Sequence, residues 1–184
     1  MVEARELRAD ARVNHDRLLE VAARAFARDG VDASLKSIAA EAGVGIGTLY
    51  RRFPTRDHLV EATYRDQTRR LGERATRLLD ELEPLSALRA WMEAFVDYML
   101  TKRGMADALP AILAEREGLR AHSRNILRDA VAQLLAACSG QVRDVDANDV
   151  LMALGGITLI SAHEEQRTLA SRLIDLQIVG LEKR

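Results

Sequence analysis

Three arginines, Arg51, Arg52 and Arg56, lie close together in a stretch without acidic residues, and Tyr50 stands beside them. Guanidinium groups bind phosphate oxygens and the guanine edge through paired hydrogen bonds, and a phenol hydroxyl donates to phosphate. The 184-residue chain has a formal net charge of −1, but a local basic surface is sufficient for contact with nucleic acid. The residue types in Gly43–Arg56 therefore indicate recognition of DNA.

The apolar residues before this stretch repeat with the period of a helix. Over residues 14–29 they recur at i, i+3, i+4, i+7 and i+8, and Gly30 stands where a helix-ending glycine is expected; they are Leu18, Val21, Ala22, Ala25 and Phe26. Ser34 is the expected N-cap of a second, two-turn helix that ends before Gly43. The inward residues of that helix are Leu35, Ile38, Ala39 and Ala42.

A third short helix is expected from about Gly45 to Phe53, because Leu49 and Phe53 are four residues apart and Pro54 ends the pattern. At about 100° per residue, the outward positions are Gly47, Thr48, Tyr50 and Arg51, with Arg52 at the margin. Two short helices joined by a glycine-containing turn form a helix-turn-helix, whose second helix enters the major groove. An ordinary helical bundle with a solvated basic patch has the same spacing, so the spacing alone leaves both interpretations open.

A fourth helix is expected over residues 55–82, with Thr55 as its N-cap and Pro84 as its terminator. Its inward stripe would be Leu71, Ala75, Leu78, Leu79 and Leu82. Lys36 and Arg56, each near the start of a helix, are expected to reach the flanking phosphates.

The segment Arg17–Leu59, RLLEVAARAFARDGVDASLKSIAAEAGVGIGTLYRRFPTRDHL, resembles the TetR family of transcriptional regulators along its whole length. The resemblance includes the alanine-rich first helix, the IAAEAGV turn and the TLY-x-x-F recognition helix. It implies an all-α dimeric repressor, in which a long helix joins a three-helix N-terminal helix-turn-helix domain to a C-terminal helical domain for ligand binding and dimerisation. It also implies DNA contacts from Lys36, Ile46, Gly47, Thr48, Tyr50 and Arg52.

The sequence thus predicts a DNA-binding domain over residues 10–70, with its helix-turn-helix at about 34–54, and a second domain over 71–184. The residues expected at the DNA are Ser34, Lys36, Gly45, Ile46, Gly47, Thr48, Tyr50, Arg51, Arg52, Thr55 and Arg56. Gly45-Ile46-Gly47 departs from the commoner polar start of the family's recognition helix. This departure leaves few side chains that can contact base edges. Phosphate contacts and groove shape are therefore expected to contribute more to DNA recognition.

The remaining chain predicts further amphipathic helices at 86–102, 105–114 and 119–138. The segment at 150–162 is apolar nearly all round, and the last helix carries two apolar stripes, which indicates two neighbours for each. These two helices are expected to form a four-helix bundle with their mates across a two-fold axis; a well-buried monomeric core is the alternative. The expected interface residues are Leu151, Leu154, Ile157, Leu169, Leu173, Leu176 and Gly180.

A small-molecule pocket is expected in the C-terminal domain because the family resemblance implies one. Its expected apolar lining is Trp91, Phe95, Tyr98, Met99, Met105, Leu109, Leu127 and Val131, although core packing is the better explanation for each residue taken alone. Ligand binding would shift the protein's conformational population toward a state in which the fourth helix displaces the helix-turn-helix. No cofactor fingerprint accompanies these residues.

Two other functional classes, an enzyme and an architectural DNA-binding protein, fit the sequence less well than a transcriptional regulator. An enzyme is disfavoured because His163-Glu164-Glu165-Gln166 begins like a zinc HExxH motif but has Arg167 in place of the second histidine. An architectural DNA-binding protein would have little use for about a hundred residues of apolar helices. The single Cys138 fits a reduced cytoplasm, and no export signal, membrane span or metal site is expected.

Overall fold

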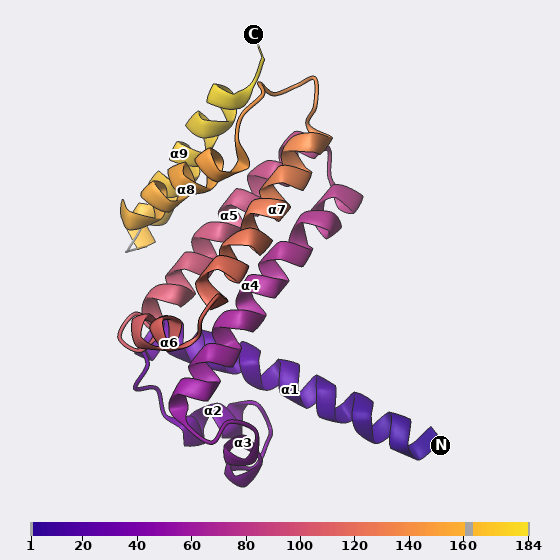
Figure 1. Cartoon of the computed structure of the whole chain (residues 1–184), viewed down its shortest axis with the longest axis vertical. Helices are drawn as coiled ribbons and strands as arrows, with labels where there is room; N and C mark the ends of the chain where they lie inside the picture. The colour runs from indigo at the N-terminus through magenta and orange to yellow at the C-terminus, as the bar shows by residue number, and fades with distance from the viewer. Residues whose placement is uncertain (1, 161–163, 184) are drawn as a thin grey trace. The chain divides into compact units, whose positions relative to one another are not determined.

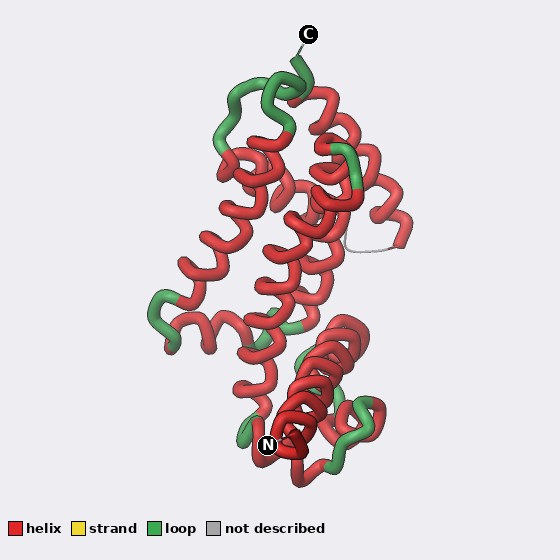
Figure 2. The backbone as a smooth tube through the Cα atoms, turned by 90° about the vertical axis from the view of Figure 1, so that its right-hand side faces the viewer, coloured by secondary structure: helices red, strands yellow, loops and turns green. Residues whose placement is uncertain are grey.

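The computed structural model describes residues 2–160 and 164–183, and the described part consists of α-helices joined by short loops and turns (Figures 1 and 2). Two compact units are present. Unit 1 contains Met1–Gln67 and Thr101–Glu117, and unit 2 contains Thr68–Leu100 and Gly118–Arg184. The helices are α1 (Val2–Asp29), α2 (Leu35–Glu41), α3 (Ile46–Arg52), α4 (Arg56–Glu81), α5 (Pro84–Gly104), α6 (Leu109–Glu115), α7 (Leu119–Ala137), α8 (Ala147–Ile160) and α9 (Glu164–Leu181).

The first helix confirms the expected apolar face and extends further than the sequence predicted. Its inward residues are all buried, and Gly30 follows with a φ of +74°, the left-handed conformation typical of a helix-ending glycine. The additional residues 2–13 are rich in Ala, Glu and Arg, which favour helix but form no apolar stripe. The apolar periodicity therefore predicted the part of α1 that begins at residue 14 and not the residues before it.

The short helices of unit 1 begin and end where their capping residues predict. The Ser34 hydroxyl accepts a hydrogen bond from the Ser37 amide at 3.3 Å, and the Thr55 hydroxyl accepts one from the His58 amide at 3.3 Å. Expected inward residues of α2 are buried, as is Leu49 of α3. In the segment predicted as a helix from residue 105, α6 begins at Leu109, so Pro110 lies in the first turn, where its missing N–H costs no hydrogen bond.

Residues 101–117 belong to unit 1 through specific contacts, although the sequence placed them in the second domain. Gly104 lies so close to the end of α1 that a Cβ there would come within 2.0 Å of the Phe26 carbonyl oxygen. Arg116 donates to Glu61 at 3.0 Å, and Arg65 donates to the other carboxylate oxygen at 2.9 Å. Burial opposes the ionisation of Glu61, but these two hydrogen bonds outweigh it, and the pKa of Glu61 is lowered.

Unit 2 is built on a core around Trp91, which is fully buried on α5. The indole N–H donates to the Leu71 carbonyl of α4 at 2.8 Å, so the polar atom of the largest core side chain is satisfied. Tyr98 of α5 and Thr68 of α4 share a buried hydrogen bond of 3.1 Å. Leu82, expected in the inward stripe of α4, is instead 42% exposed, because α4 ends at Glu81 before that position can turn inward.

Replacing Gly104 with alanine tests whether the end of α5 belongs to the N-terminal unit. The added methyl group must displace backbone atoms of Phe26 and Ala27, so we expect a loss of about 1–3 kcal/mol in the free energy of unfolding. The matched control is Gly47→Ala in α3, because a Cβ at position 47 would have no atom of another packed residue within 4 Å. This control should leave the free energy of unfolding unchanged or raise it by about 0.5–1 kcal/mol. Equal melting temperatures for both variants without DNA would contradict the close contact.

Candidate nucleic-acid interface

The expected recognition helix α3 is held by one face only. Leu49 is fully buried beneath it, and Phe53, its C-cap residue, is 6% exposed. The His15 ring of α1 stacks on Phe53 with ring centroids 5.8 Å apart and an interplanar angle of 24°. The sequence gives no signal for this contact, because His15 and Phe53 lie far apart in the chain. The buried face confirms the inward residues that the spacing predicted.

The opposite face of α3 presents the residues expected at DNA. Ile46 is 40% exposed and Tyr50 is 49% exposed, and Gly47 and Arg51 are exposed beside them. Thr48 and Arg52 are half-buried at the margins of this face. Ile46 and Tyr50 thus leave apolar side-chain area accessible on one face of this seven-residue helix.

The turn between α2 and α3 and the start of each helix set the direction of this face. Gly43 has a φ of +72°, which a residue with a side chain rarely adopts, so glycine is needed there. Gly45 is the exposed N-cap of α3 and supplies no side chain, which leaves open space in front of the helix. Ser34 is exposed, but its hydroxyl serves as the N-cap of α2, and Lys36 is exposed in the first turn.

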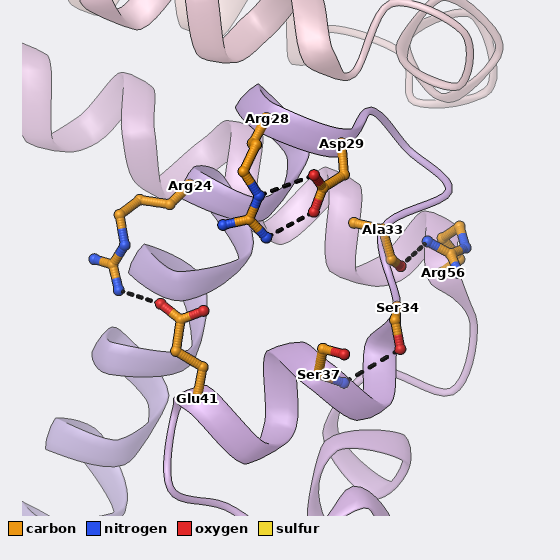
Figure 3. A network of polar contacts seen from close by, with 8 residues as sticks. All are labelled: Arg24, Arg28, Asp29, Ala33, Ser34, Ser37, Glu41 and Arg56. Atoms are coloured by element: carbon orange, nitrogen blue, oxygen red, sulfur yellow. Dashed lines mark hydrogen bonds and ion pairs between the residues drawn. The ribbon is translucent and has the colours of Figure 1, made fainter.

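An ionic contact ties the last residue of α2 to α1 (Figure 3). Arg24 donates to Glu41 at 2.9 Å and to Glu20 at 3.0 Å, and the hydrogen bond that Glu41 accepts is the main reason that the pKa of Arg24 is raised. Arg28 and Asp29 form a paired contact of 2.7–2.8 Å, which lowers the pKa of Asp29. These groups are largely exposed, so they contribute orientation more than stability.

Arg56 does not have the role that the sequence predicted. Its guanidinium is half-buried and donates to the backbone carbonyls of Val31 and Ala33, the latter at 2.7 Å (Figure 3). The expected contact with the DNA backbone is therefore corrected: Arg56 fixes the loop between α1 and α2. Thr55 is exposed, but its hydroxyl caps α4 and lies 2.7 Å from the His58 ring nitrogen.

The eight residues expected to line a ligand pocket do not come together in one unit. Met105 and Leu109 are buried in unit 1, whereas the others belong to unit 2. Trp91 and Val131 are fully buried, and Phe95, Tyr98 and Leu127 are 5–8% exposed. These five side chains therefore belong to the core of unit 2, whereas Met99 is half-buried. Helical periodicity does not distinguish a core side chain from a pocket-lining one.

The expected interface residues divide between the two faces of α8 and α9. Leu151, Leu154 and Ile157 are buried inside the protomer, so their assignment to a partner surface is corrected. The exposed apolar side chains of α8 are Met152 (64%) and Leu159 (77%). On α9 the expected stripe does face outward: Leu176 is 67% exposed, Gly180 is exposed, and Leu169 and Leu173 are half-buried.

Metal and membrane chemistry have little support in the part of the chain that is described. Among those residues, no group of three or more His, Cys, Asp or Glu is placed to hold a metal ion. The His163-Glu164-Glu165-Gln166 segment lies outside the residues whose side chains are described. No described helix has the length and apolar character required to span a bilayer. Cys138 is fully buried, and burial raises the pKa of its thiol, which makes it a poor nucleophile.

Comparisons with known proteins agree with this geometry. A family model described as bacterial regulatory proteins, tetR family, matches residues 18–63, and one described as the C-terminal domain of SbtR-like transcriptional regulators matches residues 83–183. The chain is 46% identical to the solved TetR transcriptional regulator SCO0520 of Streptomyces coelicolor, with a TM-score of 0.85 over 91% of this chain and 97% of that one. A TetR regulatory protein of Mycobacterium vanbaalenii is 33% identical, with a TM-score of 0.77 over 96% and 99%.

A shorter match links the N-terminal helices to a helix-turn-helix regulator of Staphylococcus aureus. The two are 43% identical over 54 residues, and the matched segment spans 29% of the length of that relative and of this chain. Proteins of this kind are DNA-binding regulators, so the enzyme considered from the sequence is excluded.

Tyr50 tests the outward face of α3 directly. Replacing it with alanine should abolish specific DNA binding and leave the melting temperature within a few degrees, because the side chain is half exposed and supports no core. Tyr50→Phe retains the ring and separates stacking or shape from the hydroxyl. DNA binding by Tyr50→Ala at the affinity of the parent protein, measured by fluorescence anisotropy, would show that another surface is used.

Arg52 and Arg56 should differ when each is changed to alanine. Arg52→Ala should weaken DNA binding and reduce the magnitude of the salt slope by about one, if its guanidinium neutralises one phosphate per site. Arg56→Ala removes the donor for two loop carbonyls, so it should cost about 1–3 kcal/mol in stability and leave the salt slope unchanged. A reduced slope for Arg56→Ala together with unchanged stability would reinstate Arg56 as a phosphate contact.

Proposed function

The chain belongs to the TetR family of bacterial transcription regulators, and from that premise we propose that it is a ligand-responsive repressor that binds a palindromic operator as a homodimer. The observation that supports this best is the pair of faces on α3. Leu49 is sealed on one side, while Ile46 and Tyr50 are 40% and 49% exposed on the other. A helix held in this way can enter the major groove without unfolding any part of the core.

The outward face of α3 is suited to a mixed mode of recognition. Arg51 is exposed and can bind phosphate or a guanine edge, and Tyr50 can donate to phosphate or contact a thymine methyl group. Gly45 and Gly47 carry no side chains, so the backbone can approach the DNA closely. Ile46 adds apolar contact area. We expect phosphate contacts and groove shape to carry a large share of the affinity.

Dimerisation is proposed through an α8–α9 outer face, defined as Met152, Gly156, Leu159, Leu169, Leu173, Leu176, Val179 and Gly180. The two helices contact each other, and each leaves one apolar stripe in solvent. Large aliphatic side chains that are 64–77% exposed on both helices form a patch that water disfavours. A second copy would cover it as a four-helix bundle, and a two-fold dimer presents two α3 helices to a palindromic site.

The proposed response to a ligand is a population shift. α4 is continuous from Arg56 in unit 1 to Glu81 in unit 2, and α5 likewise ends in unit 1 at Gly104. A ligand bound to unit 2 that prefers one position of these helices would alter the spacing of the two α3 helices. A coupling free energy of about 1–3 kcal/mol would weaken DNA binding roughly 5- to 150-fold, and DNA would weaken ligand binding equally.

The proposed domains are a DNA-binding domain over residues 10–70 and a ligand-binding and dimerisation domain over 71–184. Because unit 1 also holds residues 101–117, the C-terminal end of α5 and α6 would move with the DNA-binding domain. The proposed place of action is the cytoplasm, where the DNA of a bacterial cell lies.

Selection of bound fragments from genomic DNA tests the function as a whole. The expected result is a palindromic sequence whose half-sites are about one helical turn apart, or a multiple of that spacing. The Tyr50→Ala variant is the matched control and should recover no enriched sequence. Enrichment of unrelated sequences in proportion to their abundance would instead indicate a DNA-binding protein without an operator.

Leu176→Asp tests the α8–α9 outer face. A carboxylate at this 67% exposed position costs little in a single chain, but it would be buried in the bundle, so the dimer should dissociate and operator binding should fall at least about tenfold. Leu82→Asp is the matched control, because Leu82 is also exposed but lies outside this face. Mass measurement by light scattering should give a monomer for the first and a dimer for the second. A dimeric Leu176→Asp protein would locate the interface elsewhere.

A further inference from the structure

Three polar contacts join α5 to α9 in a regular ladder. Arg89 donates to Asp175 at 2.7 Å, the Ser171 hydroxyl donates to Glu93 at 3.1 Å, and Arg167 forms an ion pair with Asp97. The α5 members are four residues apart in rising order, and the α9 members are four apart in falling order. The two helices are therefore antiparallel, and these three polar contacts run along the seam between them.

A cavity of about 230 Å³ opens beside this seam, within unit 2. Four charged side chains and one hydroxyl line it: Arg74, Glu93, Asp97, Arg167 and Ser171. The rest of the lining is small and apolar, and consists of Ala90, Ala94, Val96, Ala170 and Ile174. None of the eight residues expected at the effector from the sequence lines this cavity. A ligand here would meet charge on one side and an aliphatic surface on the other.

One cationic side chain of the cavity has no acidic partner among the described residues, although the two arginines and two carboxylates of the lining sum to zero charge. Glu93 accepts hydrogen bonds from Arg89 and Ser171, and Asp97 pairs with Arg167. Arg74 of α4 differs, because no acidic residue in the described part of the chain pairs with it. An arginine that faces a cavity without a carboxylate partner leaves a positive site that an external anion can occupy.

We propose that this cavity binds a small organic carboxylate as the effector. Its carboxylate pairs with Arg74, its short apolar body lies on Ala94 and Ile174, and a hydroxyl or amine group reaches Glu93. The regulatory meaning of the site depends on the proposed function, whereas binding itself does not. Arg74 lies on α4 and Ala94 lies on α5, and both helices continue into unit 1, so a ligand touches both helices that the proposed response requires.

Binding is tested by calorimetry and thermal shift without DNA, with benzoate, 4-hydroxybenzoate and hexanoate as probes and the amide of each as its neutral counterpart. At least one acid should bind and raise the melting temperature, and its amide should not. Arg74→Gln should weaken that binding at least about tenfold. Arg77→Gln, a change at an exposed arginine of the same helix that does not line the cavity, is the matched control and should remain within about twofold.

Ala90→Leu supplies an independent variant, because it fills the cavity and keeps every charge. It should also block binding. Equal binding of acid and amide, equal loss in Arg74→Gln and Arg77→Gln, or no binding by any of the three acids would overturn the site. An acid that binds through Arg74 but leaves operator affinity unchanged would retain the site and refute its role as the effector site. Loss of operator recognition in the parent protein would refute the proposed function and leave the carboxylate result standing.

Discussion

The burial of Leu49 is the interaction on which the DNA-facing part of this molecule depends. α3 has only seven residues, and a helix of that length is not stable in water without tertiary contacts. Complete burial of one leucine contributes about 1.5–3 kcal/mol, and Phe53 and its stacked partner His15 extend the buried side. Because one side of the helix is fixed inward, Tyr50 and Ile46 have no orientation available other than outward.

Unit 1, which contains α3, also includes a part of the chain that follows α3 by some fifty residues. Gly104 meets the backbone of Phe26, and Arg116 reaches Glu61, so the end of α5 and α6 are built into unit 1. Two continuous helices, α4 and α5, therefore leave unit 1 for unit 2. The chain therefore passes between the two units within two helices rather than through loops alone.

Much of the fold could be predicted from the sequence because its signals are local. Helix caps such as Ser34 and Thr55, and helix-ending glycines such as Gly30, act within three or four residues of their own position. Arg56 was misassigned because its acceptors lie more than twenty residues earlier, and nothing at Arg56 itself indicates them. The outward position of Tyr50 was predictable because Leu49, its neighbour, carries the clear inward signal.

The faces of α8 could not be oriented from sequence for a different reason. A helix that is apolar nearly all round has no polar side to mark solvent, so Leu154 and Leu159 are equivalent until a neighbour is known. The polar ladder between α5 and α9 was missed because its charged residues read as an ordinary solvated face on each helix considered alone. The cavity beside the ladder exists only where the two helices meet.

The central claim is that the outward face of α3 lies against duplex DNA in a symmetric dimer. A photo-crosslinking residue at position 46, on the same exposed face of α3 as Tyr50, irradiated on the selected operator, measures this most directly, with position 82 as the reference on an exposed site of unit 2. The account predicts efficient crosslinks from position 46 at two places related by the operator's dyad, and background yield from position 82. Equal yields from both positions, or crosslinks without dyad symmetry, would contradict it.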